Sequence, residues 1–306
     1  MTRLAPLFGV LLITAGPLAQ RKPPVPQNPD LVELDVVVLD KLSQPVRGLT
    51  QQDFQIKEDG RPVEVKTFAA VTTAGSTRSD DGRSVSLLMD DTGIPITGTH
   101  PMRSIAQIML SPAQMGDDVS VVRLSSRSDE AFGDQDTALA RIEGYQGGVV
   151  PFSRRDSGEY ALKMVAKMAR TLELIEHRRK LIVCIGVRPV CDVEEPAQGT
   201  VSPIWPAWVD ALRATARANV SVYSVDPTGL TQRSFVRGIG LVKLTGGELF
   251  ANSNDFGPPA TAIWREASSY YLLGYWPPVS SKALHSIDVK VARKDIRVRS
   301  RQVRGG

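Results

Sequence analysis

Short apolar runs alternate with segments of helical periodicity through the middle of the chain. The apolar runs cover 84–89, 119–124, 180–186, 220–226 and 270–276. Apolar side chains recur at helical spacing over 101–114, 160–177, 205–219 and 257–269. Strands that are apolar throughout and alternate with helices are typical of a parallel sheet covered on both faces. We therefore predict an α/β fold for 83–277, with a doubly wound, mostly parallel, Rossmann-like sheet.

Both ends of the chain change to the alternation of half-buried strands, in part at the N-terminal end. An N-terminal β segment is predicted for 31–70, where 32–38 places valine and leucine on one face. A C-terminal β hairpin is predicted for 283–304, with a turn at 293–295. Because an isolated hairpin is barely stable, we expect the two segments to pack together as one small β unit.

The first thirty residues have the layout of an exported protein. Residues 1–19 combine a basic start, a short apolar stretch and a small-residue end, as a signal peptide does, and 20–30 form a proline-rich linker. The apolar stretch is too short to favour a membrane-spanning helix. We expect a secreted, periplasmic or cell-envelope protein with no transmembrane segment after signal cleavage. The alternative is an uncleaved amphipathic N-terminus on a cytosolic protein.

Composition agrees with a globular protein that buries a core, since 42% of the 306 residues are hydrophobic and 23% are charged. The net charge is +4, and much of the basic excess follows Lys282. One interpretation is a surface for nucleic acid or another polyanion. The other is the solvated face of an edge hairpin, where lysine and arginine prevent edge-to-edge pairing. No aromatic residues interleave with these charges, which favours the second interpretation and no nucleic-acid partner.

The chain contains two cysteines, Cys184 and Cys191. Their spacing does not suit a zinc site, and no further cysteine completes one. They could close a small disulfide loop in an oxidising compartment, or Cys184 could be a buried strand residue.

Residues 90–94, Asp-Asp-Thr-Gly-Ile, follow the first strand of the predicted sheet, at the edge where such sheets bind ligands. This arrangement, followed by a helix and by Gly-Asp-Asp-Val-Ser-Val-Val at 116–122, resembles a von Willebrand factor A domain. Further segments resemble bacterial VWFA-related proteins over about 31–303; they lie at 36–40, 48–54, 58–60, 220–226, 244–247 and 270–277. The resemblance implies a domain that binds a partner.

In members of this family with an intact adhesion site, Mg²⁺ is held by Asp-x-Ser-x-Ser, a threonine and a further aspartate. The resemblance assigns Asp90 and Thr92 to the first motif, with Asp91 beside them as a third candidate metal ligand. Ile94 replaces the last hydroxyl, and Gly186 lies where the further aspartate is expected. Substitutes for the missing groups, namely Ser153, Ser157 and Asp192, are poorly placed. The site is thus degenerate: either Mg²⁺ binds to these few ligands, or Asp90 and Asp91 are capping and turn residues.

Enzyme motifs are not found. An aspartyl phosphatase needs a second carboxylate where Thr92 stands, and the chain has no nucleophile elbow, metalloprotease motif or P-loop. The three histidines, His100, His177 and His285, are scattered and are expected on the surface. We expect a non-catalytic module that binds a protein partner through the loops at 90–97, 186–203 and 226–233. The alternatives are a metal-dependent hydrolase that uses a strand-end carboxylate, and a structural subunit of an envelope assembly.

Overall fold

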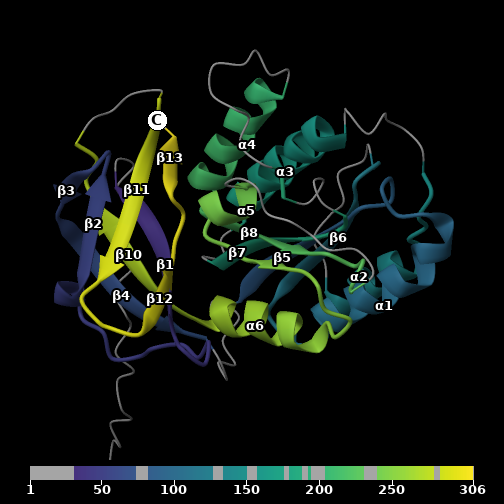
Figure 1. Ribbon diagram of the computed structural model, residues 1–306, viewed down its shortest axis with the longest axis horizontal. Helices are drawn as coiled ribbons and strands as arrows, with labels where there is room; N and C mark the ends of the chain where they lie inside the picture. The colour runs from purple at the N-terminus through teal and green to yellow at the C-terminus, as the bar shows by residue number, and fades with distance from the viewer. Residues whose placement is uncertain are drawn as a thin grey trace, which may run out of the picture.

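A computed structural model describes residues 31–73, 82–126, 134–149, 157–175, 179–187, 192–193, 204–230, 240–278 and 283–305. The predicted signal peptide and proline-rich linker lie outside the described residues. The strands at the two ends of the chain, purple and yellow in Figure 1, lie together beside a helix-covered parallel sheet.

The parallel sheet has five strands in the order β6-β5-β7-β8-β9. Its strands are β5 (Arg83–Met89), β6 (Asp118–Arg123), β7 (Arg179–Ile185), β8 (Val220–Val225) and β9 (Leu249–Phe250). β6 and β7 flank β5 on opposite sides, so the loops that follow these strands leave the sheet around one central position.

Helices cover both faces of this sheet (Figure 1). One face packs against α1 (Thr99–Leu110), α2 (Gln135–Glu143) and α6 (Gly257–Ser268), the other against α3 (Ser157–Glu173), α4 (Trp205–Arg217) and α5 (Leu241–Leu244). Successive strand residues serve opposite faces: Leu87 belongs to the first core and Leu88 to the second. This explains why the strands are apolar throughout.

Eight further strands in the described part of the chain form two antiparallel sheets. One has the order β12-β1-β10-β4, made of β1 (Val32–Asp40), β4 (Val65–Thr72), β10 (Ser269–Tyr275) and β12 (Ile296–Arg299). The other has the order β13-β11-β2-β3, made of β2 (Phe54–Glu58), β3 (Arg61–Val63), β11 (Leu284–Val291) and β13 (Val303–Gly305). A shared core joins residues of both sheets, among them Leu34 and Leu273 with Ile56 and Ile287.

The predicted fold class, a doubly wound, mostly parallel Rossmann-like sheet with a small β unit, is wrong. The described strands form two antiparallel sheets and one parallel sheet, and most of them are antiparallel. β10, predicted as the last strand of the parallel sheet, instead pairs antiparallel with β1 and β4. Burial explains the error. Every residue of β10 is buried, so its apolar pattern cannot be distinguished from that of a central strand in a parallel sheet.

The C-terminal strands also differ from the expected hairpin. β11 pairs with β2 and β13, whereas β12 pairs with β1, so the two strands lie in different sheets. Asp295 has a φ of 62° in the turn that leads into β12. The C-terminal segment therefore contributes strands to both antiparallel sheets and does not form a hairpin at the edge of one sheet.

Charged side chains near the C-terminus connect the antiparallel sheets to the α/β part of the fold. Arg299 on β12 forms ion pairs with Glu266 of α6 and Glu248, and Arg301 donates to the carbonyl oxygens of Ala216 and Glu33. Arg304 of β13 pairs with Glu58 of β2, and both strands belong to the sheet β13-β11-β2-β3. The expectation that the basic C-terminal segment forms a solvated face is therefore wrong for Arg299, Arg301 and Arg304, because each is held by partners within the fold.

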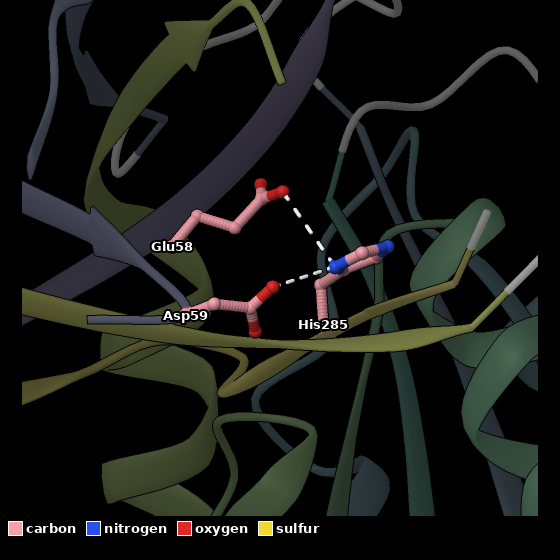
Figure 2. Close-up of side chains that lie close together, drawn as sticks. All are labelled: Glu58, Asp59 and His285. Atoms are coloured by element: carbon pink, nitrogen blue, oxygen red, sulfur yellow. Dashed lines mark hydrogen bonds and ion pairs between the residues drawn. The ribbon is translucent and has the colours of Figure 1, made fainter. Parts of the chain in front are cut away.

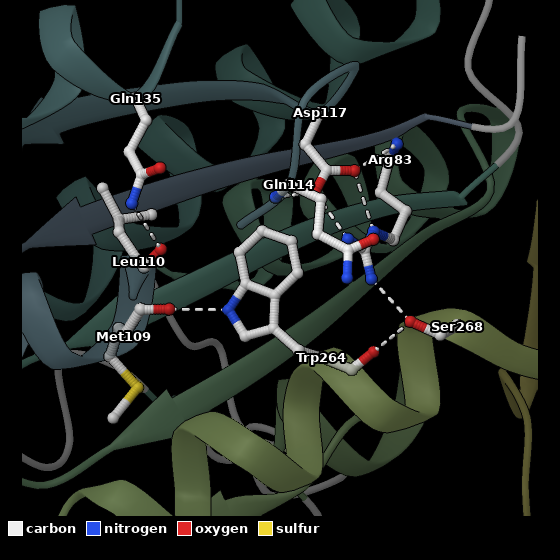
Figure 3. Close-up of polar contacts among 8 residues, drawn as sticks. All are labelled: Arg83, Met109, Leu110, Gln114, Asp117, Gln135, Trp264 and Ser268. Atoms are coloured by element: carbon white, nitrogen blue, oxygen red, sulfur yellow. Dashed lines mark hydrogen bonds and ion pairs between the residues drawn. The ribbon is translucent and has the colours of Figure 1, made fainter. Parts of the chain in front are cut away.

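The amino edge of the parallel sheet is closed by a second polar cluster (Figure 3). The guanidinium of Arg83, at the start of β5, pairs with Asp117, donates to Ser268 Oγ and lies 4.6 Å from the ring centre of Trp264. Trp264 Nε1 donates to the carbonyl oxygen of Met109 at 2.6 Å. These contacts fix α6 and α1 at the amino edge, and the opposite edge is the one that carries the predicted site.

Among the described residues, no helix is both long and apolar enough to cross a membrane.

Candidate functional site

Asp90 follows the last residue of β5, at the carboxyl edge of the sheet. Its backbone N–H donates to the carbonyl oxygen of Ile185 at 2.9 Å, which continues the sheet by one residue. Its Oδ1 accepts three hydrogen bonds: from the backbone N–H of Thr92 at 3.0 Å, from Thr92 Oγ1 at 3.0 Å and from the N–H of Gly93 at 2.7 Å. One oxygen of Asp90 thus holds the turn that follows the strand.

The other oxygen of Asp90, Oδ2, is buried and has no hydrogen-bond partner in the structure. Burial raises the pKa of the Asp90 carboxyl above its ordinary value, although the hydrogen bonds from Gly93 and Thr92 and the nearby Val187 N–H act in the opposite direction. Gly93 leaves room for this oxygen: a Cβ at that position would lie 2.5 Å from Asp90 Oδ2 and 2.7 Å from Val187 Cγ2. Oδ2 is therefore enclosed by the chain rather than open to a ligand.

Asp91 uses its carboxylate to connect two loops of the same edge. Its Oδ1 accepts from the N–H of Ser125 at 2.9 Å, and its Oδ2 accepts from Ser125 Oγ at 2.5 Å. Ser125 follows β6, so this pair fixes the loop after β6 against the loop after β5. Tyr145 Oη adds a hydrogen bond of 2.7 Å to the carbonyl oxygen of Asp90, and burial raises the pKa of the Tyr145 phenol.

The residues expected to complete a metal site do not converge on Asp90. Ile94 is buried in the core that includes α1. Gly186 contributes a backbone hydrogen bond to Val225 but no ligand side chain. Asp192 Oδ1 accepts from the N–H of Val242 at 3.1 Å, at the start of α5.

Neither serine supplies the missing hydroxyl from a described loop position. Ser157 begins α3, and Ser153 lies outside the described residues. Mg²⁺ requires near-octahedral oxygen ligands and retains several waters. The enclosed oxygen of Asp90, with Thr92 donating to the opposite oxygen, does not fit that requirement.

A second Asp-x-Thr turn, which sequence reasoning missed, follows β8. Asp226 Oδ1 accepts from the N–H of Thr228 at 2.9 Å and from Thr228 Oγ1 at 2.7 Å, as Asp90 does with Thr92. The repeated pattern after two apolar strands was visible in the sequence and could have revealed it. Two turns of the same type therefore shape this edge, one after β5 and one after β8.

A pocket of about 300 Å³ adjoins the second turn. It is lined by Asp226, Phe250, Phe256, Pro258 and further residues of the segment 249–259. Leu230, beyond the turn, is 67% exposed, and its N–H donates to Asn254 Oδ1 at 3.1 Å. Ile96, after β5, is 61% exposed. This edge of the sheet therefore combines a partly apolar hollow with exposed apolar side chains.

Two of the loops assigned to this edge are described only in part. Residues 188–191, 194–203 and 231–233 lie outside the described residues. Cys184, one residue before the end of β7, is buried and disulfide-bonded. Cys191, the other cysteine of the chain, lies outside the described residues.

A cluster that the sequence did not indicate lies where the end of β2 meets the start of β11 (Figure 2). His285 Nδ1 is 2.7 Å from Asp59 Oδ2 and 4.0 Å from Glu58 Oε1. The hydrogen bonds from His285 and Ser286 lower the pKa of the Asp59 carboxyl. His285 was expected on the surface, but it is 8% exposed. Periodicity and spacing gave no signal for this cluster, because 226 positions separate His285 from Asp59.

Comparison with known proteins yields no family. No family model and no curated protein matches the chain. Similar solved structures include a mutant of the PilB minor pilin from Streptococcus sanguinis, at 12% identity and a TM-score of 0.38, covering 60% of this chain and 62% of that one. The human COPII-coat protein Sec24c is another, at 10% identity and a TM-score of 0.38, covering 74% of this chain and 44% of that one. The chain spans less than two thirds of either structure, and likenesses this weak carry no argument. The resemblance to VWFA-related proteins stays a prediction.

Proposed function

We propose that this chain is a non-catalytic module that binds a protein partner at the carboxyl edge of its parallel sheet, outside the cytoplasm. The observation that carries the proposal is the apolar character of that edge. Ile96 and Leu230 are 61% and 67% exposed there, and the pocket that Asp226 lines has two phenylalanines in its lining. Large apolar and aromatic side chains at a surface hollow are typical of sites that anchor a protein partner.

The hydrogen bonds and burial of the Asp90 and Asp91 carboxylates support a binding role over a catalytic one. Both oxygens of Asp91 accept hydrogen bonds from Ser125 in the loop after β6, and one oxygen of Asp90 accepts them within its own turn. A general base must be able to reach the proton that it abstracts. Asp90 and Asp91 are fully buried and act here as residues that hold loops in place.

A metal-dependent hydrolase is the second candidate, and one observation favours it: Asp90 lies at the carboxyl edge of the parallel sheet, where such sheets bind ligands. Activity against phosphoester and ester substrates, measured with and without Mg²⁺, tests this alternative. Turnover that is lost in Asp90→Asn would replace the binding proposal with the hydrolase.

The compartment is part of the proposal. The disulfide bond at Cys184 supports an oxidising environment, as does the export-like layout of residues 1–19. Mass spectrometry of the protein from its native host should find an N-terminus near Gln20 in the extracytoplasmic fraction. A chain that begins at Met1 in the cytosol would contradict this part of the proposal.

Site-specific cross-linking in the native host tests the binding surface. A photoreactive residue in place of Ile96 or Leu230 is expected to give the same discrete cross-linked product. The control is Met115, which is 100% exposed and precedes β6 at the amino edge. The proposal fails if positions 96 and 230 give no product, or only the product that position 115 gives. The proposal is supported if the product formed from position 96 disappears when Leu230→Glu is added, and if the product formed from position 230 disappears when Ile96→Glu is added.

A further inference from the structure

The cluster formed by Glu58, Asp59 and His285 has the composition of a site for a transition-metal cation. One carboxylate oxygen from each acid and the Nδ1 atom of His285 all lie within 4.8 Å of one another. Figure 2 shows both carboxylates directed toward the same side of the imidazole ring. We propose that these three side chains bind one Zn²⁺ ion.

The backbone fixes the positions of the three ligands. Glu58 ends β2, and it pairs in register with Ile287 of β11. The N–H of Asp59 donates to the carbonyl oxygen of Ser286 at 3.0 Å, and the N–H of Ser286 donates back to Asp59 Oδ1 at 2.9 Å. Because the second bond uses Oδ1, the other oxygen of Asp59, Oδ2, is directed toward His285. Two strands from opposite ends of the chain therefore present the ligands together.

The distances need only small side-chain movements to suit the metal. Zinc bonds of about 2.0–2.2 Å in tetrahedral geometry place neighbouring ligand atoms about 3.3–3.5 Å apart. His285 Nδ1 lies 2.7 Å from Asp59 Oδ2 and 4.0 Å from Glu58 Oε1, so the first distance must lengthen and the second must shorten by about 0.6 Å each. The Asp59 side chain is 52% exposed, which allows it to move and leaves a path for the ion and for a coordinated water.

The charges of the cluster permit a divalent cation. Arg304 offsets one of the two carboxylates through its ion pair with Glu58. With a neutral imidazole, the cluster keeps one negative charge. A carboxylate oxygen has two lone pairs, so Glu58 Oε1 is able to accept from Arg304 and still bind a metal. Arg304 then acts as a group that orients the ligand, at a cost in affinity.

The donor set selects the kind of metal. An imidazole nitrogen with two carboxylate oxygens suits Zn²⁺ better than Mg²⁺, which takes oxygen ligands in a rigid octahedron. The metal takes the place of the proton between His285 Nδ1 and Asp59 Oδ2.

Calorimetric titration of the full chain with Zn²⁺ tests the proposal. One ion is expected to bind per cluster, and the melting temperature should rise by several degrees at saturating Zn²⁺, since the ion binds the folded state. Asp59→Asn is the decisive variant. Asparagine tolerates the φ of 48° at this position and retains the bond from Ser286, but it removes the anionic ligand. Its affinity should fall about tenfold or more.

Two further variants separate the site from general effects. His285→Ala should abolish the Zn²⁺-dependent rise in melting temperature. Asp288→Asn, the same chemical change as the decisive variant but on the 56% exposed side chain of Asp288 in β11, should leave it unchanged. Absence of saturable Zn²⁺ binding to the unmodified chain would overturn the proposal. So would binding that Asp59→Asn and His285→Ala leave unaltered, since the ion would then be held elsewhere.

Discussion

Arg179, the first residue of β7, reaches out of the parallel sheet and donates from Nη1 to Oδ2 of Asp35 on β1, over 2.8 Å. Both side chains are buried, with 2% and 4% of their surfaces exposed. The guanidinium of Arg179 also lies 5.2 Å from the ring centre of Tyr270. This pair links the antiparallel sheet that contains β1 to the amino edge of the parallel sheet.

We expect Asp35→Ala to lower the free energy of unfolding by about 3–5 kcal/mol, because it leaves the cation of Arg179 buried without its counter-charge. The double variant Asp35→Leu with Arg179→Met removes both charges and should cost clearly less than the two single changes added together. Urea denaturation of the unmodified chain, Asp35→Leu, Arg179→Met and the double variant measures this, with Asp35→Ala compared separately. Additive losses would show that the two side chains do not depend on each other.

The stability difference between Asp90→Asn and the unmodified chain should depend on pH. Burial raises the pKa of Asp90 above its ordinary value of 3.8, so the folded state favours the protonated carboxyl. The stability contributed by that carboxyl is fully present below pH 3.8 and is lost as the pH rises through the raised pKa.

Asparagine at position 90 retains an oxygen for the bonds from Thr92 and Gly93 but carries no charge. Asp90→Asn should therefore gain stability relative to the unmodified chain as the pH increases from about 4 to 8. Denaturant unfolding of both proteins across this range is the measurement. A variant that becomes relatively less stable with rising pH would instead indicate a cation that stabilises the ionised Asp90.

Mg²⁺ at millimolar concentration should leave the melting temperature almost unchanged. Ile94 and Gly186 supply no ligand side chain to Asp90, and Mg²⁺ gives up its waters reluctantly. A ligand at a hundredfold excess over its dissociation constant stabilises by about 2.7 kcal/mol, which a thermal melt would detect. Asp90→Ala should not alter the response. A clear Mg²⁺-dependent rise that is lost in Asp90→Ala would contradict this expectation.

Deletion of the residues after Lys282 should strongly destabilise the chain. It removes Ile287 and Val289 from the core shared by the two antiparallel sheets, at about 1.5–3 kcal/mol each. It also leaves the buried carboxylate of Glu58 without Arg304.

The single change Arg304→Met isolates the second effect and should cost about 3–5 kcal/mol. Arg293→Met, at an exposed turn position, is the matched control and should change stability by less than about 0.5 kcal/mol. Thermal or urea unfolding compares the variants. An unchanged melting temperature after the deletion would contradict the role assigned to these strands.

Local patterns in the sequence predicted several elements closely. The apolar run at 84–89 corresponds to β5, and the helical spacing over 160–177 to α3. The strand-end position of Asp90 also followed from the sequence, because an acidic pair directly after an apolar run marks the end of a strand. These features depend on neighbours within a few residues, so the sequence alone determined them.

Tertiary structure decided what the buried groups contact. The sheet to which β10 belongs was not predictable, because a strand buried on both faces has the same pattern in a parallel and in an antiparallel sheet. The partners of Asp90 Oδ1 follow within three residues, but the partner of Asp91 is Ser125, which lies 34 positions away. His285 and Asp59 meet only because β11 pairs with β2. From sequence, a charged side chain is predicted to be exposed, because burial of a charge is tolerated only when the charge is paired. Which counter-charge lies beside it is decided by the tertiary fold.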